Sequence, residues 1–588
     1  MAGVSRILMV AIFAVVLLQV TARVAEAAAA VAPTSKPLIR IEGGMHNAQI
    51  NRLAVDRRNR ILATASSDKT VRLWSVSDGA LLKVLRVPLG QGAEGQLFAV
   101  ALSPTGDLVA AGGWTGVTWD KSYSLYLFDV ESGVIVRRFT GLPSTIKHLA
   151  FSADGRLIAV MLSSGKGIRI FRATTGERVS GNDDCQDDAV WGDFSADGRL
   201  VVSCYDGTVY LYGRDWHLSA KREFRQGVRP HGVAFSPEAD KVAVGFADNP
   251  KVAVLSGQGL VPLYEADTSG VRGNLWSVVW SNDGRRRLFA AGTHASRGVA
   301  RIRWWADEGV SDRSGESEVG EWVAPGGTIT GILPLGDGSL VFASTGPSLG
   351  RLDAQGFTAF LKESPSANFA GLHGRLLASQ DGTSVQFGFG GGGTLPAVFS
   401  VRDLRLSNAP DSTGNLKGPV ESSPGVTIDG WDGGNELTLN GRGLPLESGE
   451  TTRCLAIDPK GRYFVVGTSL NLRVYTLAGS LRTRLPIVAE AQGVTVSGDG
   501  RIIVMALANG TIHWYRVASG RRLLSLFPHR DRQRWVVWTP AYFYAASRDG
   551  DKLIGWHRNQ SASREALFYP IGRHGSGYNR PDLIRKLF

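Results

Sequence analysis

The chain has 588 residues, of which 73 are Gly, 15 are Trp and only 20% are charged. Many glycine-rich turns and bulky strand-forming side chains, with few charged helix-forming stretches, favour an all-β protein of more than one domain. The formal net charge is +12. No aromatic-interleaved basic motif or known nucleic-acid module accompanies this charge, so we predict no nucleic-acid partner.

The N-terminus has the pattern of a secretory signal. One basic side chain, Arg6, precedes an apolar run from Ile7 to Val20. This run is shorter than the roughly 20 residues that a membrane span needs. Ala25-Glu26-Ala27 then offers a small-x-small cleavage site. We therefore predict a signal peptide over residues 1–27 and a periplasmic or secreted mature protein; an uncleaved anchor is the alternative.

A linker over residues 28–37 leads to the strand-like segment LIRIE, and the next stretch, 46–74, reads as three short strands joined by polar turns. Four side chains stand out there by their spacing: His46, Thr64, Asp68 and Trp74. Imidazole, hydroxyl, carboxylate and indole N–H groups can close a buried hydrogen-bond chain in which no group lacks a partner. We predict a structural role for this tetrad; the alternative is a hydrolase triad.

This tetrad resembles a WD repeat, whose pattern is a His, a Ser or Thr, an Asp and a Trp before a polar residue. Here Trp74-Ser75 replaces the usual Trp-Asp. Similar copies follow from Gln96 at a pitch of roughly 40 residues, such as FAVALSPTGDLVAAGG and GDFSADGRLVVSCYDGTVYLY. About a dozen copies exceed the four to eight blades of one ring. We therefore predict an all-β fold of two tandem WD-repeat-like β-propellers.

The copies suggest an N-terminal propeller over residues 38–325, a C-terminal propeller over 326–557 and a tail over 558–588. Propellers commonly close through an N-terminal strand, which makes Leu38 to Glu42 a candidate closing strand by analogy. The tetrad decays in later copies: Cys185 takes the His place, for example. Packed apolar strand faces must then hold those copies together.

Cysteines and carboxylates gather in one copy. Export would put the chain in an oxidising compartment, and we predict a disulfide between Cys185 and Cys204; two buried thiols are the alternative. The pairs Asp183-Asp184 and Asp187-Asp188 flank Cys185. Their oxygens suit a hard cation, with solvated loop carboxylates as the alternative, and we assign no metal site.

The block from Trp535 to His557, with FYP and NRPDLI after it, resembles the propeller region of bacterial proteins that join WD repeats to a caspase-like protease domain. The resemblance covers most of the chain from about Leu38. Ala541-Tyr542-Phe543 and the loop GRHGSG depart from the expected pattern. A caspase-type cysteine sits in a Gln-Ala-Cys-x-Gly setting, which none of the three cysteines has, so we infer no protease activity.

The sequence favours an exported, non-enzymatic scaffold for protein interaction or sensing, and the resemblance implies a caspase-like protease as its partner. We predict no catalytic residue, no cofactor and no membrane contact beyond an uncleaved signal. Two alternatives stay open. One is a periplasmic propeller enzyme with carboxylates or histidines around a central channel. The other is binding of a small ligand or an anionic envelope polymer through basic loops.

Overall fold

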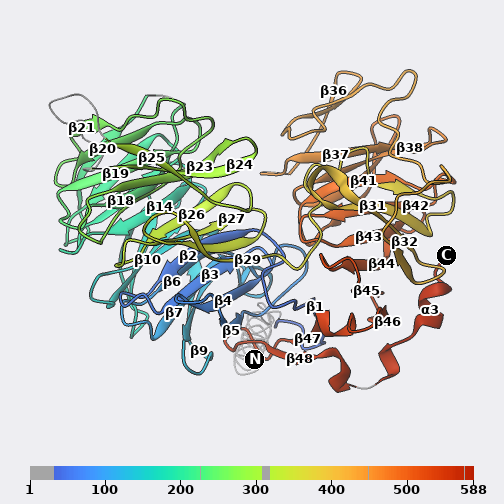
Figure 1. Cartoon of the computed structure of the whole chain (residues 1–588), viewed down its shortest axis with the longest axis horizontal. Helices are drawn as coiled ribbons and strands as arrows, with labels where there is room; N and C mark the ends of the chain where they lie inside the picture. Colours follow the sequence, from blue (N-terminus) through green and yellow to red (C-terminus); the bar gives the residue numbers. More distant parts are fainter. Residues whose placement is uncertain (1–31, 226, 307–317, 448, 575) are drawn as a thin grey trace, which may run out of the picture.

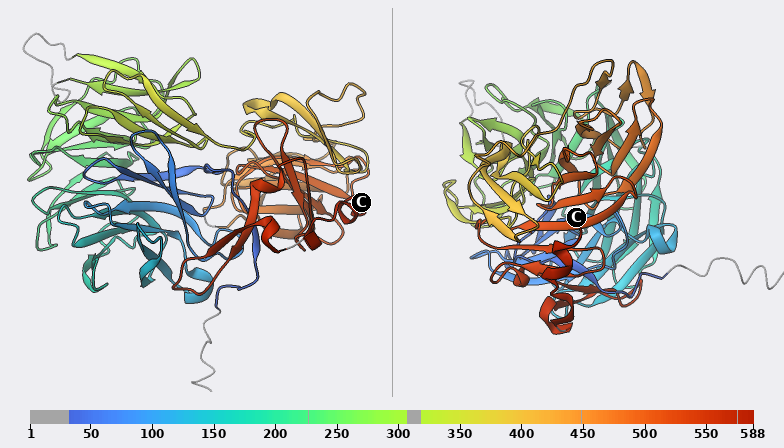
Figure 2. Two further views of the ribbon diagram at one scale, coloured as in Figure 1. Left: turned by 60° about the horizontal axis from the view of Figure 1, so that its bottom comes forward. Right: turned by 90° about the vertical axis from the view of Figure 1, so that its right-hand side faces the viewer.

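The computed structural model describes residues 32–588 except 226, 307–317, 448 and 575 (Figure 1). The predicted signal peptide lies outside the described residues. The described part of the chain forms twelve β-sheets, nine of them four-stranded. Its helices are short, and none combines the length and apolar character that a membrane span requires. The sheets form two units that lie side by side, as two views from other directions also show (Figure 2).

The first unit contains seven four-stranded antiparallel sheets in chain order. Sheet 1 is β2 (Ile50–Val55), β3 (Ile61–Ser66), β4 (Thr70–Ser75) and β5 (Leu81–Arg86); sheet 2 is β6 (Gln96–Leu102), β7 (Leu108–Trp114), β8 (Tyr123–Asp129) and β9 (Ile135–Leu142), with helix α2 (Val117–Asp120) between β7 and β8; sheet 3 is β10 (Ile146–Phe151), β11 (Leu157–Leu162), β12 (Ile168–Arg172) and β13 (Arg178–Asn182). Sheet 4 is β14 (Ala189–Phe194), β15 (Leu200–Cys204), β16 (Thr208–Tyr212) and β17 (Leu218–Glu223); sheet 5 is β18 (Pro230–Phe235), β19 (Lys241–Phe246), β20 (Val252–Ser256) and β21 (Pro262–Glu265). Sheet 6 is β22 (Ser277–Trp280), β23 (Leu288–Ser296), β24 (Val299–Trp305) and β25 (Val319–Val323); sheet 7 is β26 (Ile329–Pro334), β27 (Leu340–Ser344), β28 (Ser348–Leu352) and β29 (Thr358–Glu363).

The first strands of these seven sheets form a closed ring. Each first strand contacts the first strand of the next sheet, and β26 contacts both β22 and β2. Sheet 7 therefore lies between sheets 6 and 1, and the first strands surround a central region that we call the channel. The first unit thus runs to Glu363, whereas the sequence-based boundary at 325 had put these strands in the second unit.

One turn chemistry recurs between the first two strands of a sheet. In sheet 3, Ser152 Oγ donates to Asp154 Oδ1 over 2.5 Å, and the Gly155 N–H donates to the Ser152 carbonyl over 2.8 Å. Gly155 has φ 72°, a left-handed conformation that glycine adopts without a steric penalty. The same Ser-x-Asp-Gly sequence starts at Ser195 and Ser497. This turn fixes the hairpin register and therefore which residues of each strand face the core.

The second unit has five less regular sheets. Sheet 8 is β30 (Leu377–Ala378), β31 (Ser384–Gly390), β32 (Thr394–Ser400) and β33 (Arg405–Ser407), with the turn η2 (Gly391–Gly393) at a hairpin tip; sheet 9 is β34 (Ile428–Asp429), β35 (Leu437–Leu439) and β36 (Arg442–Leu444). Sheet 10 is β37 (Thr452–Ile457), β38 (Tyr463–Thr468), β39 (Asn471–Thr476) and β40 (Leu481–Pro486); sheet 11 is β41 (Ala491–Val496), β42 (Ile502–Leu507), β43 (Ile512–Arg516), β44 (Arg521–Pro528), β45 (Trp535–Trp538) and β46 (Tyr544–Ala546). Sheet 12 is β1 (Leu38–Ile41), β47 (Ile554–Arg558) and β48 (Leu567–Pro570), and the remaining elements are η3 (Asp551–Leu553), η4 (Ile571–His574), η5 (Ser576–Tyr578) and α3 (Pro581–Arg585).

The first and last strands of the described chain meet in sheet 12. β1 pairs antiparallel with β47, with Leu38 opposite His557 and Ile41 opposite Ile554. The candidate closing strand thus pairs with a C-terminal strand, and the first ring is inserted between β1 and the rest of the second unit. Residues 558–588, expected as a tail, contain β48, η4, η5 and α3. Ile584 of α3 is fully buried against sheets 8 and 11.

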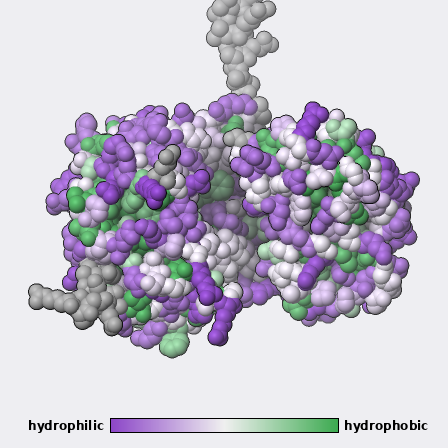
Figure 3. Space-filling model, turned by 90° about the horizontal axis from the view of Figure 1, so that it is seen from above, coloured by the Kyte–Doolittle hydropathy of each residue, from purple (hydrophilic) through white to green (hydrophobic). Residues whose placement is uncertain are grey.

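The loop between β47 and β48 joins the two units. Asn559 accepts a hydrogen bond from the Leu89 N–H and donates one to the Leu89 carbonyl. The Arg138 guanidinium donates to the Ala562 carbonyl over 2.8 Å. A space-filling view shows two lobes with a recess between them (Figure 3).

Candidate functional site

The sequence-predicted tetrad lies together in sheet 1 and is buried. His46 Nδ1 lies 2.7 Å from Asp68 Oδ2, and His46 Nε2 lies 2.7 Å from Thr64 Oγ1. The Trp74 indole N–H donates to Thr64 Oγ1 over 2.8 Å. Burial lowers the pKa of His46 despite the nearby carboxylate, so with its proton on Nδ1 the neutral ring donates to Asp68 and accepts from Thr64. Thr64 is fully buried, which leaves a substrate no access to its hydroxyl.

A disulfide occupies the corresponding place in sheet 4. Cys185 precedes β14 and is bonded to Cys204 at the end of β15, with a Cα–Cα distance of 5.8 Å. The neighbouring Gln186 N–H donates to Asp206, as the Asn47 N–H donates to Asp68 in sheet 1. The covalent bond therefore holds the same loop that the His46 imidazole holds in sheet 1.

Removing this disulfide is expected to destabilise the protein by about 3 kcal/mol, because the bond closes a loop of 19 residues and so restricts the unfolded chain. We would measure denaturant unfolding of the Cys185→Ser/Cys204→Ser double variant. Cys454→Ser serves as the matched control, since Cys454 is a buried free thiol. Equal stability of the double variant and the wild type would contradict the role assigned to the bond.

A third interaction of this kind, a hydrogen-bond network in sheet 10, was not predicted. Glu450 Oε1 accepts hydrogen bonds from the Thr468 hydroxyl, the Asn471 amide and Arg473 Nε over 2.6 to 2.9 Å. Thr468 follows Glu450 by 18 residues, the spacing that also separates His46 from Thr64. That shared spacing could have revealed the network, but Glu instead of the His of the repeat pattern occupies this place.

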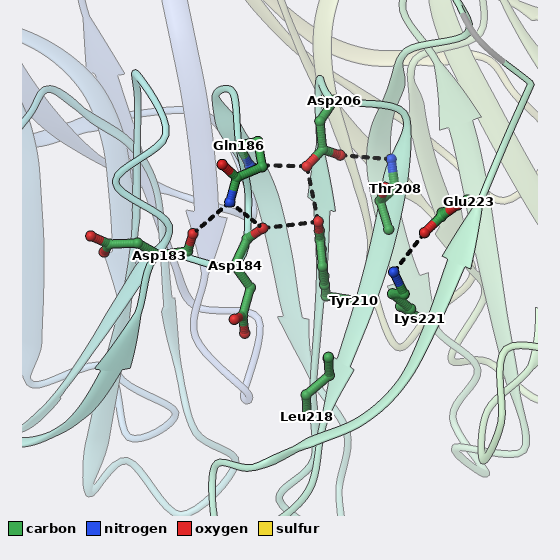
Figure 4. A pocket seen from close by; sticks show the side chains of 9 residues that line it. All are labelled: Asp183, Asp184, Gln186, Asp206, Thr208, Tyr210, Leu218, Lys221 and Glu223. Atoms are coloured by element: carbon green, nitrogen blue, oxygen red, sulfur yellow. Dashed lines mark hydrogen bonds and ion pairs between the residues drawn. The ribbon is translucent and has the colours of Figure 1, made fainter.

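Of the four carboxylates that flank Cys185, two line a cavity of about 510 Å³ on sheet 4, whose wall contains Asp183, Asp184, Gln186, Asp206, Thr208, Tyr210, Leu218, Lys221 and Glu223 (Figure 4). The carboxylates are engaged by the protein itself. Asp206 accepts from the Tyr210 hydroxyl over 2.9 Å, and Asp183 pairs with Arg169 over 2.9 Å. Asp188 pairs with Lys147 over 2.9 Å.

The structure does not bring the four sequence-predicted carboxylates together. Among the described residues, metal-ligand atoms converge only at Cys185, Cys204 and Asp206. Both sulfur atoms of that group are committed to the disulfide. The cluster therefore offers one carboxylate, which is too few for a hard cation that takes six to eight oxygen ligands.

The central channel of the first ring has a recurring backbone feature. In six of the seven sheets the inner strand has a β-bulge near its start. Bulges turn side chains away from the regular strand pattern and are common at the rims of barrels. The residues outside the regular pairing are Asn51, Phe98, Lys147, Val190, His231, Gly232 and Thr330.

Side chains from several inner strands, some of them from or beside these bulges, meet in the channel. The Arg52 guanidinium lies 4.4 Å from the centre of the Trp191 indole. Arg52 Nη2 also donates to the Val190 carbonyl over 3.1 Å, which joins sheet 1 to sheet 4 across the channel. His148 stacks on Trp191 with ring centres 4.7 Å apart, and His231 lies 5.7 Å from Trp191 and 6.0 Å from Trp276. We call these five residues the channel cluster: Arg52, His148, Trp191, His231 and Trp276.

The channel cluster carries one positive charge at neutral pH. Burial, reinforced by Arg52, lowers the pKa of His231 to about 3 and that of His148 well below its ordinary value. Both imidazoles are therefore neutral. Burial also lowers the pKa of Arg52, to about 10, which leaves it charged. Neither histidine forms an ion pair with a carboxylate among the described residues, so the cluster offers no coupled acid and base.

Part of the channel cluster faces solvent. Arg52, Trp191, His231 and Trp276 are half-buried. Tyr205, in the turn between β15 and β16, lies 6.0 Å from His231, which places the cluster at the channel end where the inner strands begin. Amphipathic aromatic rings beside a guanidinium are the side chains that dominate binding energy in protein interfaces. No local sequence pattern had indicated this site.

Seven four-stranded sheets around a central channel define a β-propeller. The family described as "WD domain, G-beta repeat" matches residues 37–75 and 187–213. The first segment contains β1 and three strands of sheet 1, and the second contains three strands of sheet 4. Two segments of this β-propeller chain are therefore similar to WD repeats. The predicted all-β fold of two tandem propellers is confirmed, with twelve sheets in the described residues.

The chain is similar to short parts of eukaryotic proteins. It is 28% identical over 210 residues to the periodic tryptophan protein 2 homolog of Schizosaccharomyces pombe, covering 31% of this chain and 23% of that protein. It is 30% identical over 95 residues to the small ribosomal subunit protein RACK1y of Oryza sativa subsp. japonica, covering 16% of this chain and 27% of that protein. It is 38% identical over 96 residues to the WD repeat-containing protein 26 homolog of Drosophila melanogaster, covering 16% and 14%. The chain thus spans at most about a quarter of the length of these relatives, and none of the three names refers to a protease.

Proposed function

We propose that this protein is a non-enzymatic scaffold that binds a protein partner at the channel mouth of its first ring. The channel cluster carries this proposal. It combines half-buried Trp191 and Trp276 with the Arg52 guanidinium at the end of the ring. Trp and Arg are enriched among the residues that contribute most to protein–protein binding, whereas the cluster lacks the paired acid and base that an enzyme site requires.

We further propose that the scaffold is exported. The signal-like N-terminus supports this, as does the disulfide between Cys185 and Cys204, because such bonds persist mainly in oxidising compartments. A caspase-like protease is the partner class that the resemblance of Trp535 to His557 implies. That partner rests on the resemblance alone.

The experiment is a crosslinked pull-down, with the chain from Ala28 onward as bait in a periplasmic extract and mass spectrometry as the readout. We expect one stoichiometric protein with the wild type. The Trp276→Ala variant is expected to recover roughly 30-fold less, because truncating a central aromatic residue costs about 2 kcal/mol or more of binding free energy.

Two further variants make this experiment specific. Phe357→Ala is the matched control, since Phe357 is 72% exposed in the outer turn before β29 and should leave recovery unchanged. Tyr205→Ala removes an aromatic ring at the channel mouth but keeps the hydrogen bond from the Trp276 indole to the Ile329 carbonyl. Its recovery therefore tests whether the mouth itself binds the partner. Equal recovery by all four proteins would contradict the proposed surface, and no recovery by any would contradict the scaffold function.

A further inference from the structure

We propose that the channel mouth binds a carboxylate at Arg52, and that the partner supplies it as an acidic side chain. This inference rests on the proposed function only for the source of the carboxylate. The site itself is argued from the described residues of the first ring, in particular from the charge balance around Arg52.

Arg52 is a partly buried cation whose hydrogen bonds all go to neutral groups. Its Nε donates to His148 Nδ1, its Nη1 to the Asn51 carbonyl and its Nη2 to the Val190 carbonyl, over 2.9 to 3.2 Å. A guanidinium has five N–H donors, so two remain for a ligand. Within the described parts of the chain, no carboxylate forms an ion pair with Arg52.

Two arginines that are almost fully buried in the inter-strand networks are each paired with an acid. Arg72 Nη1 lies 2.8 Å from Glu42 Oε1, and Arg473 Nε lies 2.9 Å from Glu450 Oε1. Asp188, whose charge acts on Tyr205 at the mouth, is already engaged, because it pairs with Lys147 and accepts from the Ser164 N–H. Withdrawing an unpaired charge from water is unfavourable. A carboxylate that entered the mouth would supply the missing counter-charge.

Two further buried polar atoms lie on the bulged inner strands. His231 Nδ1 and Thr330 Oγ1 are inaccessible to solvent and have no hydrogen-bond partner in the described structure. Unsatisfied buried polar atoms are uncommon in folded proteins and call for an explanation. Thr330 is the bulged residue of β26, which contacts the β2 strand that carries Arg52. Its hydroxyl has no partner within the described structure and is therefore a candidate second donor to a carboxylate bound in the channel.

The test is a calorimetric titration of the purified full-length protein with an eight-residue glutamate peptide at fixed ionic strength. We expect the peptide to bind the wild type and acetate to compete with it. Arg52→Gln, which keeps polar atoms but removes the charge, should weaken peptide binding at least tenfold. Thr330→Val, which replaces only the hydroxyl, should weaken it several-fold. Arg137→Gln is the control, because Arg137 lies on the outer strand β9 and donates to the carbonyls of Thr174 and Thr175.

The outcomes distinguish carboxylate binding at Arg52 from the claim that the partner supplies the carboxylate. Equal peptide affinity of the wild type and Arg52→Gln, or binding of inorganic phosphate but not of acetate or peptide, would overturn the carboxylate site. If Arg52→Gln does not fold, Thr330→Val and acetate competition with the wild type decide the question. Undiminished partner capture by Arg52→Gln would overturn the partner as the source of the carboxylate but leave the scaffold function intact. Failure of the wild type to capture any partner would overturn the scaffold function and leave the peptide result standing.

Discussion

Replacing Asp68 with Ala is expected to lower the free energy of unfolding by about 3–5 kcal/mol at pH 7, because each buried donor left without its acceptor costs about 1–3 kcal/mol. Asp68 Oδ2 accepts from His46 Nδ1 over 2.7 Å, and Oδ1 accepts from the Thr70 hydroxyl and N–H over 2.6 and 2.9 Å. Without the carboxylate these buried donors would lack acceptors, and Arg72 would lose a nearby negative charge.

The pH dependence of the Asp68 contribution follows from its pKa. Burial alone would raise the pKa of Asp68, but the hydrogen bonds from the His46 and Thr70 side chains and the charge of Arg72 outweigh burial and hold this pKa well below the usual range. A depressed carboxyl pKa stabilises the folded state above the unfolded pKa, and this stabilisation is lost as the pH falls toward the folded pKa. The difference between the wild type and Asp68→Ala should therefore be constant near neutral pH and shrink below about pH 4.

Denaturant unfolding of both proteins measures this effect. Asp215→Ala is the matched control, since Asp215 is an exposed carboxylate in the turn between β16 and β17 and its loss should change stability by less than about 0.5 kcal/mol. If Asp68→Ala lowers the free energy of unfolding by less than about 1 kcal/mol, the tetrad does not stabilise sheet 1 as described.

Glu450→Gln should have a comparable effect in the second unit, again about 3–5 kcal/mol at pH 7. The side chains of Glu450 and Arg473 are almost fully buried. Burial would raise the pKa of Glu450, but the hydrogen bonds from Arg473 and Thr468 prevail and lower it from 4.5 to about 2. The Glu450 contribution to stability is therefore complete above pH 4.5 and is lost as the pH falls toward 2.

The measurement is denaturant unfolding of the wild type and Glu450→Gln between pH 7 and pH 2. Glu436→Gln is the control, because Glu436 is an exposed carboxylate of the same unit. The two stability curves should converge between pH 4.5 and pH 2. A gap that persists unchanged at pH 2 would mean that the ionised Glu450 is not the source of the stabilisation.

The repeats made much of the fold predictable, because each copy encodes its own strands and turns, with a Ser-x-Asp-Gly turn in several copies. The unit boundary was harder to place. The sequence of a copy such as ITGILPLGDGSLVFAS does not indicate which ring the copy belongs to. Sheet 7 is assigned to the first ring because β26 contacts β2. Likewise, β45 and β46 extend sheet 11 instead of starting a new sheet, which no turn sequence distinguishes.

The candidate site was less predictable than the fold. The His46 tetrad and the pair of cysteines each lie within one copy, so their spacing was visible in the sequence. Arg52, His148 and Trp191 lie in three different sheets of the first ring, and Trp276 directly precedes β22 of a fourth. They meet only because the ring closes and brings the first strands of these sheets together. Such long-range convergence has no local sequence pattern.

The most direct test of the proposed scaffold surface is site-specific photocrosslinking in the captured complex. A photoreactive benzoyl-phenylalanine would replace either Phe98, the bulged residue of β6 at the channel mouth, or the exposed Phe357 of the outer turn. The two positions carry the same native residue type, so they differ mainly in location. We expect a covalent partner adduct from position 98 and none from position 357. An adduct from position 357 alone would place the partner on the outer edge of the ring and contradict binding at the channel mouth.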